Sequence, residues 1–474
     1  MTDANSSPDA VIAKLSAGAD KVIATSCAVV VLKDDQAFKI KKSVDYGFLN
    51  FTSQPRRREA LERELKFNQR TAADVYREVI EVDGEAVLVM RRFDQSMVLA
   101  EQSLSDPDWS PNIDLMQTLG EVIADFHAGS EVCRDPSHAA NIKYVIDSNR
   151  SNIDVFRQHL GAARVEDYDQ RISQAYEQVK SVVQDRFDEG FVRRCHGDLH
   201  LGNIFVEMDR PVLFDCIEFN ERLSQIDVLY DLAFLLMDLW VRGHKQAANR
   251  VMNAYMDKAA RNEADDGRLY SGLKLLPLYM SVRAGVRCHV NAHYGDLEQA
   301  SVYLDAAMAF LEMDKAGLMA VGGLSGSGKT TYARRIADSK GRSPGAVILR
   351  SDEIRKRLWD WPSFERLPAE AYTHEETDKV YSHIKRLAGI VLASGQSVIL
   401  DATFRDLSPR EAMEALAETT SVHFEGIWLD LSREERVRRV AVRSNDASDA
   451  TEAVADSQAE VKDLSSKWTR IEAI

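Results

Sequence analysis

Short apolar stretches near the start of the chain predict a small β-rich lobe. Residues 28–32 are apolar and mostly β-branched, a polar turn follows them, and residues 37–41 alternate between apolar and polar side chains. Both patterns are typical of strands, and residues 78–82 and 86–91 predict a second hairpin that turns at an Asp-Gly pair. Between the hairpins, residues 56–71 carry Leu, Arg and Glu at helical spacing, so one helix is expected there.

The next part of the chain follows a helical period. Residues 115–127 have the pattern of an amphipathic helix, and residues 142–182 are mostly helical in character. Residues 226–240, 245–258 and 273–311 continue the helical pattern. We therefore expect a second lobe that is mainly α-helical.

The pattern changes after Lys315, where four short apolar runs alternate with helical stretches. The runs are residues 318–321, 346–349, 397–400 and 424–429. Continuous apolar runs of this length suit buried parallel strands. Strand–helix alternation predicts a doubly wound α/β domain.

Length and pattern together indicate two domains, because 474 residues exceed one ordinary hydrophobic core. Residues 1–314 would form an α+β bilobal domain, with the small lobe at about 20–95 and the large lobe at about 96–314. Residues 315–474 would form the α/β domain, and little linker separates the two. No run of eighteen apolar residues occurs, so no membrane span is expected.

Composition narrows the class of protein. The start of the chain lacks the basic and apolar regions of a signal peptide, and the five cysteines are scattered without CxxC spacing. A reducing, cytoplasmic compartment is expected. The net charge of −15 repels polyanions, which disfavours a nucleic-acid partner without excluding one. The oligomeric state does not follow from the sequence.

A glycine-rich loop follows the first apolar run of the α/β region and precedes a helix. Its spacing, Gly-x4-Gly-Lys-Thr, is that of a phosphate-binding P-loop, in which glycines let backbone N–H groups approach phosphate oxygens. Lys329 would reach the β- and γ-phosphates of ATP, and Thr330 would place its hydroxyl on Mg²⁺. The expected nucleotide-binding residues are Gly323, Ser325, Gly326, Ser327, Gly328, Lys329, Thr330 and Thr331.

Polar residues at later strand ends would complete this site. Asp352 follows the second apolar run and could accept a proton from an acceptor hydroxyl, while Arg355 on the same helix face could hold an anionic group of the acceptor. Asp401 ends the third run and could hold Mg²⁺ or its water. For both aspartates the alternative is a helix cap. Arg439 and Arg443, with Arg436, fall at helical spacing and would form either a catalytic lid or a solvated basic face.

This set of residues resembles the P-loop kinases that include polynucleotide 5′-kinases, gluconate-type kinases and zeta-toxin-like enzymes. The resemblance covers about residues 316–474 and rests mainly on the loop from Gly323 to Thr330. It implies that Asp352 and Arg355 face the acceptor and that Arg439 and Arg443 belong to a lid. The substrates of these kinases vary widely, so the resemblance does not name the acceptor.

A second motif in the first domain has the spacing His-x-Asp-x4-Asn. In this spacing Asp198 would orient and deprotonate an acceptor hydroxyl, and Asn203 would hold Mg²⁺. Asp215, after a short strand, would bridge the metal and the phosphates. Ala37-Phe38-Lys39 resembles the Ala-x-Lys of the third strand of protein-kinase-like folds, and this resemblance implies that Lys39 binds the α- and β-phosphates and pairs with a helix glutamate. Lys41 is the rival lysine, and for the glutamate we expect Glu64, with Glu62 as the rival.

The region 20–310 resembles the aminoglycoside phosphotransferase family, which shares the protein-kinase-like fold. The loop His196-Gly197-Asp198-Leu199-His200-x-x-Asn203 carries this resemblance, and residues 90–93 would be the hinge that meets adenine. His127 is expected to be structural. The chain departs from protein kinases in lacking a Gly-rich loop before Lys39. Asp215 is followed by Cys216-Ile217-Glu218, without the glycine that protein kinases have after this aspartate. Glu218 would supplement the metal site or bind the acceptor.

The tandem order resembles bacterial proteins described as bifunctional aminoglycoside phosphotransferase/ATP-binding proteins. We therefore expect an enzyme with ATP and Mg²⁺ as cofactors that phosphorylates hydroxyls of small molecules at two sites. Two alternatives stay open. One domain could be a regulatory nucleotide-binding or ATPase module, or the P-loop domain could be a polynucleotide 5′-hydroxyl kinase. The sequence names neither acceptor, and it does not imply that an aminoglycoside is one.

Overall fold

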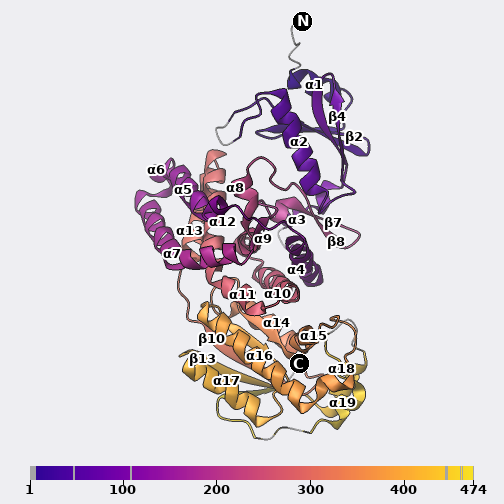
Figure 1. Cartoon of the computed structure of the whole chain (residues 1–474), viewed down its shortest axis with the longest axis vertical. Helices are drawn as coiled ribbons and strands as arrows, with labels where there is room; N and C mark the ends of the chain where they lie inside the picture. The colour runs from indigo at the N-terminus through magenta and orange to yellow at the C-terminus, as the bar shows by residue number, and fades with distance from the viewer. Residues whose placement is uncertain are drawn as a thin grey trace. The chain divides into compact units, whose positions relative to one another are not determined.

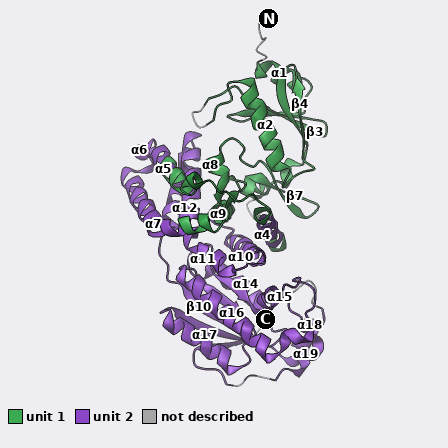
Figure 2. Ribbon diagram, in the orientation of Figure 1, with its two compact units in different colours: residues 1–115, 126–148, 183–238 green, residues 116–125, 149–182, 239–474 purple. Residues whose placement is uncertain are grey.

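The computed structural model describes residues 7–45, 49–106, 109–442, 447–459, 461 and 463–472. The chain forms two compact units, each built from segments that are distant in sequence (Figure 2). Unit 1 consists of residues 1–115, 126–148 and 183–238, and unit 2 consists of residues 116–125, 149–182 and 239–474. The predicted division at residue 314 does not coincide with these units, because unit 2 joins helices from before that point to the whole α/β region.

Unit 1 begins with an antiparallel sheet in the strand order β1-β2-β3-β5-β4. Figure 1 labels two of its strands, β2 and β4. Apolar side chains on one face of the sheet, including Val31 and Ile40, form a core with α1 (Pro8–Ser16). The helix α2 (Gln54–Asn68) starts with a proline in its first turn, where a missing N–H removes no helical hydrogen bond. It packs on β5 and buries Glu64 beside the sheet. The strands are β1 (Lys21–Ala24), β2 (Ala28–Lys33), β3 (Gln36–Lys41), β4 (Tyr76–Val82) and β5 (Glu85–Arg91).

The remainder of unit 1 contains two small antiparallel pairs. One pair is β6 (Val192–Arg194) with β9 (Gln225–Asp227), and the other is β7 (Ile204–Glu207) with β8 (Arg210–Leu213). The loop between β6 and β7 and the loop after β8 carry the predicted catalytic and metal-binding residues. Short helices α3 (Leu99–Ser105) and α8 (Glu221–Ser224) also belong here.

Several long helices contribute residues to both units. They are α4 (Ile113–Ala128), α5 (Asn141–Asp154), α7 (Ala162–Asp188) and α9 (Val228–Val241). Unit 2 adds the helices α6 (Arg157–Leu160), α10 (Lys245–Ala260), α11 (Asp266–Ser271), α12 (Leu276–His293) and α13 (Leu297–Ala309). Among the described residues, no helix combines the length and the apolar character that a membrane span requires.

The α/β part of unit 2 is a parallel sheet in the order β11-β12-β10-β13-β14. Its central strand, β10, lies between β12 and β13, so the strand order reverses at β10, where ligands of α/β sheets bind. Apolar residues of the sheet, including Val321 and Ile399, pack with α14 in one core. The strands are β10 (Gly317–Gly323), β11 (Val347–Arg350), β12 (Val398–Asp401), β13 (His423–Asp430) and β14 (Trp468–Glu472). The helices are α14 (Lys329–Ile336), α15 (Ser351–Leu358), α16 (His374–Ala393), α17 (Leu407–Thr419), α18 (Arg433–Ala441) and α19 (Glu452–Ser457).

The predicted fold class is confirmed, with differences in detail. Strands β10 to β13 each begin within one residue of the predicted apolar runs. The edge strand β14 is not predicted, because its sequence, Trp-Thr-Arg-Ile-Glu, is too polar to form an apolar run. The helical region 142–182 is interrupted near Gly161, whose φ of +93° ends a helical path.

Candidate functional site

Two lysines on the same face of β3 meet a network of three carboxylates, of which Glu64 and Glu218 are buried. Lys39 Nζ lies 2.5 Å from Glu64 Oε1 and 2.8 Å from Asp215 Oδ1. Lys41 Nζ lies 2.7 Å from Glu64 Oε2 and 2.6 Å from Glu218 Oε1. Burial disfavours the charged lysine, but the carboxylates of Asp215 and Glu64 raise the pKa of Lys39 well above its usual value. Lys39 is therefore a fixed positive charge beside Asp215.

The structure distinguishes the residues that the sequence left open. Glu64 is fully buried and bridges both lysines, whereas Glu62 is largely exposed and lies 3.8 Å from Arg58. Of the two lysines, Lys39 contacts Asp215. Glu218 is 7% exposed and its carboxylate pairs with Lys41, which argues against the acceptor-binding role expected for it. A buried pair of this kind holds the loop after Asp215 in place.

One buried aspartate, Asp231, holds the start of the motif that runs from His196 to Asn203. Asp231 accepts hydrogen bonds from the backbone N–H groups of His196 and Gly197, at 2.9 and 2.8 Å, and lies 3.1 Å from His127 Nε2. Gly197 has φ of +85°, and a Cβ there would lie 2.8 Å from the carbonyl oxygen of Leu223. His127 thus helps to hold the loop.

Asp198 and Asn203 lie in direct contact at the end of this loop. Asn203 Nδ2 donates to the carbonyl oxygen and to Oδ2 of Asp198, both at 2.9 Å, and His200 Nε2 lies 3.4 Å from Oδ2. The Asp198 side chain is 39% exposed, so a hydroxyl can approach it. Because the amide nitrogen of Asn203 is bound to Asp198, its amide oxygen is the atom suited to a cation.

Asp215 follows β8 in an unusual backbone conformation, with φ of +62°. Its N–H donates to the Tyr76 hydroxyl at 3.1 Å, which fixes the turn. Desolvation and the negative charge of Asp198 would each raise the pKa of the Asp215 carboxyl. The positive charge of Lys39 outweighs them and lowers the pKa below its ordinary value. Asp215 and Asn203 supply carboxylate and amide oxygens, the hard ligands that Mg²⁺ prefers. The donor set therefore fits a magnesium ion between them.

The P-loop of unit 2 has the backbone that phosphate binding requires. Gly323, Gly326 and Gly328 have φ of +148°, +85° and +87°. A Cβ on Gly326 would lie 2.5 Å from the Arg436 carbonyl oxygen, so only glycine fits there. Ser327 is fully buried inside the loop, and α14 begins directly at Lys329. The loop therefore directs the N-terminus of a helix toward the cavity.

Side chains at the P-loop and at the end of β12 lie in contact. Thr330 Oγ1 donates to Asp401 Oδ2 at 2.6 Å, and Lys329 Nζ donates to the Leu324 carbonyl at 3.1 Å. Asp401 is 5% exposed and closes its strand rather than capping a helix. A hydroxyl and a carboxylate in contact are again hard oxygen donors, which fit Mg²⁺.

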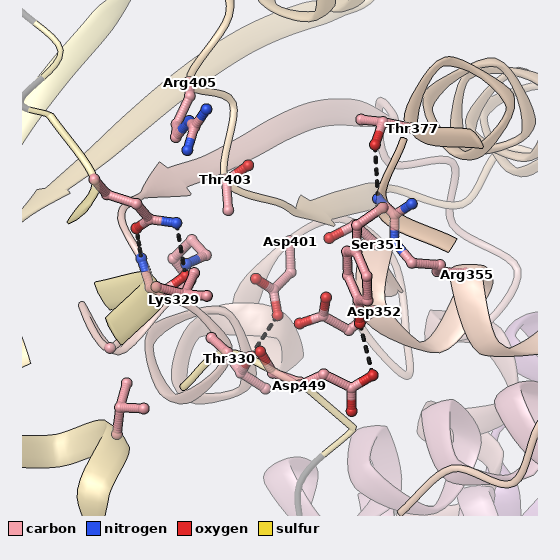
Figure 3. Close-up of a pocket in the computed structure, with 18 of the residues that line it drawn as sticks. Lys329, Thr330, Ser351, Asp352, Arg355, Thr377, Asp401, Thr403, Arg405 and Asp449 are labelled. Atoms are coloured by element: carbon pink, nitrogen blue, oxygen red, sulfur yellow. Dashed lines mark hydrogen bonds between the residues drawn. The ribbon is translucent and has the colours of Figure 1, made fainter. Parts of the chain in front are cut away.

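Asp352 and Arg355 lie on one face of α15 and line the same cavity (Figure 3). Burial raises the pKa of Asp352 above its ordinary value, although Arg350 and a hydrogen bond with Ser448 oppose the shift. Arg355 is 7% exposed and donates to the Ala371 carbonyl at 2.6 Å. Its guanidinium also lies 4.9 Å from the centre of the Tyr372 ring. The cation is thus held rigidly at the cavity wall.

The predicted arginine helix is α18, and its members differ in placement. Arg439 lines the cavity and donates to Glu435 Oε1 at 2.9 Å. Arg436 is buried and donates to the Ala455 carbonyl at 2.8 Å. Arg443 lies outside the described residues. The structure therefore brings one of the two expected lid arginines, Arg439, to the cavity.

The cavity has a volume of about 980 Å³ and extends from the P-loop to α15. Lys329 and Thr330 lie at one end and Arg355 at the other, with Asp352 and Asp401 between them (Figure 3). Ser325 and Thr331 also line the cavity. Sequence reasoning missed further lining residues. Thr403 and Arg405 follow directly after β12, so their position near the strand end could have been predicted. Tyr372, Thr377, Asp449 and Gln458 come from distant segments and carry no local signal.

Gln458 and Asp449 bring the C-terminal segment to both ends of this cavity. Gln458 Oε1 accepts the Ser325 N–H at 2.7 Å, and its Nε2 donates to the Ser325 hydroxyl at 3.0 Å. Asp449 accepts the Tyr372 hydroxyl at 2.6 Å and lies 2.9 Å from Lys356 Nζ. The segment thus spans the cavity from the P-loop to α15.

Two family models match the chain. Residues 52–264 match the phosphotransferase enzyme family, and residues 318–464 match the AAA domain family. The resemblance expected from the two motif sets, a phosphotransferase-type region followed by a P-loop kinase-like region, is therefore confirmed. The motifs His196 to Asn203 and Gly323 to Thr330 lie within the matched spans.

Relatives resemble the chain over nearly its whole length. The uncharacterized protein Rv2004c of Mycobacterium tuberculosis (strain ATCC 25618 / H37Rv) is 29% identical over 451 residues, which span 91% of this chain and 88% of the relative. The uncharacterized protein Mb2027c of Mycobacterium bovis (strain ATCC BAA-935 / AF2122/97) gives the same values. The similarity extends over both matched regions.

Solved structures resemble one part of the chain each. Choline kinase from Cryptosporidium parvum Iowa II is 11% identical, with a TM-score of 0.43, and the match covers 64% of this chain and 94% of that one. A gluconokinase from Sinorhizobium meliloti 1021 is 19% identical, with a TM-score of 0.24, covering 33% and 82%. Wild-type aminoglycoside 2′-phosphotransferase-IIIa in its GDP complex is 14% identical, with a TM-score of 0.35, covering 62% and 93%.

Proposed function

We propose that the protein is a bifunctional kinase that transfers the γ-phosphoryl group of ATP to hydroxyls of small-molecule acceptors, at one site in each region. The two matched families support phosphotransferase activity. The observation that carries the proposal is the presence of two complete sets, each with a phosphate-binding lysine, oxygen donors for a cation and an aspartate for the acceptor. Bound Mg²⁺ would supply charge neutralisation for the transferring group.

At the first site, Lys39 holds the α- and β-phosphates. Asp215, which forms an ion pair with Lys39, faces the same phosphates. Asp198 accepts the proton of the acceptor hydroxyl, and Asn203 keeps the carboxylate in one orientation through its hydrogen bond. Asn203 and Asp215 hold the metal. Catalysis at this site consists mainly of positioning, as in other phosphoryl transfers.

At the second site, the P-loop N–H groups and Lys329 hold the phosphates, and Arg439 faces the cavity where charge develops. Thr330 and Asp401 hold the metal. Asp352 accepts the proton of the acceptor hydroxyl, while Arg355 binds an anionic group of the acceptor. Desolvation of the partly buried Asp352 raises its pKa, which makes it a stronger base than an exposed aspartate.

The acceptors in this proposal are small molecules, and the compartment is the cytoplasm. The free state of all five cysteines supports a reducing compartment. The net charge of −15 disfavours a nucleic-acid acceptor.

The test is transfer of label from γ-labelled ATP to a metabolite extract. The full chain is compared with Asp198→Ala, Asp352→Ala and the double variant. We expect each single variant to lose a different set of labelled products and the double variant to lose all of them. Products that survive in the double variant would contradict the proposal. Release of inorganic phosphate alone, unchanged by extract, would favour a regulatory ATPase instead.

A further inference from the structure

A chain of alternating charges runs from the end of α10 to the carboxylate that pairs with the P-loop threonine. Arg261 Nη2 donates to Glu353 Oε2 at 2.7 Å. Glu353 Oε1 lies 3.7 Å from Arg350 Nη1, and Arg350 Nε lies 3.5 Å from Asp401 Oδ2. Asp401 Oδ2 also accepts the Thr330 hydrogen bond. Arg350 is therefore shared between two carboxylates.

The chain of charges joins the two matched regions within unit 2. Arg261 lies in the span that matches the phosphotransferase enzyme family, whereas Glu353, Arg350 and Asp401 lie in the AAA domain span. Arg261 also donates to the Trp361 carbonyl at 2.9 Å, which fixes its guanidinium beside Glu353.

These charges are shielded from water, so each strongly affects the next. The side chains of Arg350 and Asp401 are 8% and 6% exposed, and those of Glu353 and Arg261 are 14% and 21% exposed. Charge interactions between groups with so little solvent contact are several times stronger than the same interactions in water. Removing the charge of Arg261 therefore changes the electrostatic interactions of each later member of the chain of charges.

The helix α15 connects this chain of charges to the cavity because it has two functional faces. Asp352 and Arg355 line the cavity, three residues apart and on one side. Glu353 and Arg357, four residues apart, face α10 and α11, where Arg357 Nη2 lies 2.9 Å from Asp266 Oδ2. The helix is thus held by the charges on its other face.

We propose that Arg261 and Glu353 determine how much of the Arg350 charge falls on Asp401, and that they thereby tune the affinity of the P-loop site for its divalent cation. This inference rests on the proposed function of the second site. Arg261 and Glu353 are positioning residues, because neither touches the nucleotide-binding loop.

The direction of the effect follows from charge balance. Without Arg261, Glu353 has Arg350 as its main cationic partner, so Arg350 shifts toward Glu353 and leaves Asp401 more negative. The cation then binds more tightly. Without the Glu353 charge, a larger share of the Arg350 charge falls on Asp401 and competes with the cation, which then binds more weakly. A purely structural role would change the affinity in the same direction in both variants.

The experiment measures ATP binding by calorimetry, with Mg²⁺ and with EDTA, in the full chain. All samples carry Asp215→Asn, which weakens the first site. Arg261→Ala is expected to increase the ratio of Mg²⁺-dependent to Mg²⁺-free affinity by about fivefold, the size expected for one partly screened charge beyond direct contact. Glu353→Gln is expected to decrease the ratio by a similar factor. Affinity in EDTA should stay unchanged in both.

Three further variants complete the test. Arg261→Lys should restore the parent ratio, and Arg261→Glu, at the same partly exposed position, should raise the ratio beyond Arg261→Ala. Lys258→Ala is the matched control, because it removes a positive charge from the same helix where Lys258 pairs with Asp125 at 3.2 Å. Equal ratios in the Arg261 series, or shifts of the same sign in Arg261→Ala and Glu353→Gln, would overturn the inference. Binding that is insensitive to Lys329→Ala would instead overturn the proposed function of the second site, and the inference with it.

Discussion

Lys39 and Lys41 lie two positions apart on β3 and share Glu64, yet their second partners differ in exposure. Lys39 contacts Asp215, whose side chain is 44% exposed and can face a ligand. Lys41 contacts Glu218, which is buried with it. We therefore propose that Lys39 serves the nucleotide and that Lys41 stabilises the fold of the loop.

Replacing each lysine by methionine should separate these roles. Lys41→Met leaves the buried Glu218 without its cation and should lower the free energy of unfolding by about 3–5 kcal/mol. Lys39→Met should cost less stability but abolish nucleotide binding at the first site. Chemical denaturation and calorimetry provide the two measurements. Equal losses of stability in both variants would argue against the division of roles.

The pH dependence of transfer at the second site should reflect the partly buried position of Asp352. A general base must be ionised, and burial raises the pKa of Asp352, so activity should be lost on acidification at a higher pH than for an ordinary aspartate of about 3.9. The rate of label transfer against pH, in an Asp198→Ala chain, measures this limb. A limb at the ordinary value would contradict the role of Asp352.

At the scale of the element, the P-loop depends on its close packing against α18 as well as on glycine's freedom. Gly326 and Gly243 have almost the same positive φ, +85° and +89°, but a Cβ would meet the Arg436 backbone at Gly326 and nothing within 4 Å at Gly243. Substitutions at the two glycines can therefore separate the effect of backbone strain from the effect of a displaced loop.

Gly243→Ala should lose about 1 kcal/mol of stability from strain, and Gly326→Ala should lose more, because its Cβ also meets the Arg436 backbone. Only Gly326→Ala should also weaken nucleotide binding at the second site, by about tenfold or more, because displaced N–H groups lose charge-assisted hydrogen bonds. Binding of ATP by the two variants is compared in the Asp215→Asn background. Equal affinities would show that the loop tolerates the side chain.

Much of the site could be predicted from the sequence because its residues are local in the chain. The loop from Gly323 to Thr330 and the spacing of Asp198 and Asn203 place chemistry within a few residues, and strand ends predicted Asp352 and Asp401. The burial of Glu218 could not be predicted, since its partner Lys41 is 177 positions away. Likewise, Gln458 reaches Ser325 only through the fold.

At the scale of the molecule, unit 2 combines helices of the phosphotransferase-type region with the α/β sheet. Asn249 Nδ2 donates to the Ala346 carbonyl at 3.0 Å, and the Ile348 N–H donates to Asn253 Oδ1 at 2.7 Å, so α10 satisfies backbone groups beside and within β11. Asp266 Oδ2 lies 2.7 Å from His383 Nε2. The side chains of Asn249, Asn253 and Asp266 are buried, and separation of the regions would leave polar groups without partners.

Cleavage of the connection between the regions should therefore not separate them. A protease site introduced after Asp314, between α13 and β10, is cut in the folded chain. We expect the two pieces to elute together in size-exclusion chromatography, and Asn253→Ala to weaken their association. Pieces that elute separately at micromolar concentration would show that the two regions are independent.

The proposed bifunctional kinase requires two separate ATP sites in one chain. The stoichiometry of Mg²⁺–ATP binding, measured by calorimetry, tests this requirement directly. A non-hydrolysable ATP analogue should bind at two sites per chain, at one site in Asp215→Ala, at the other in Lys329→Ala, and at neither in the double variant. A single site per chain that either substitution abolishes would contradict the account.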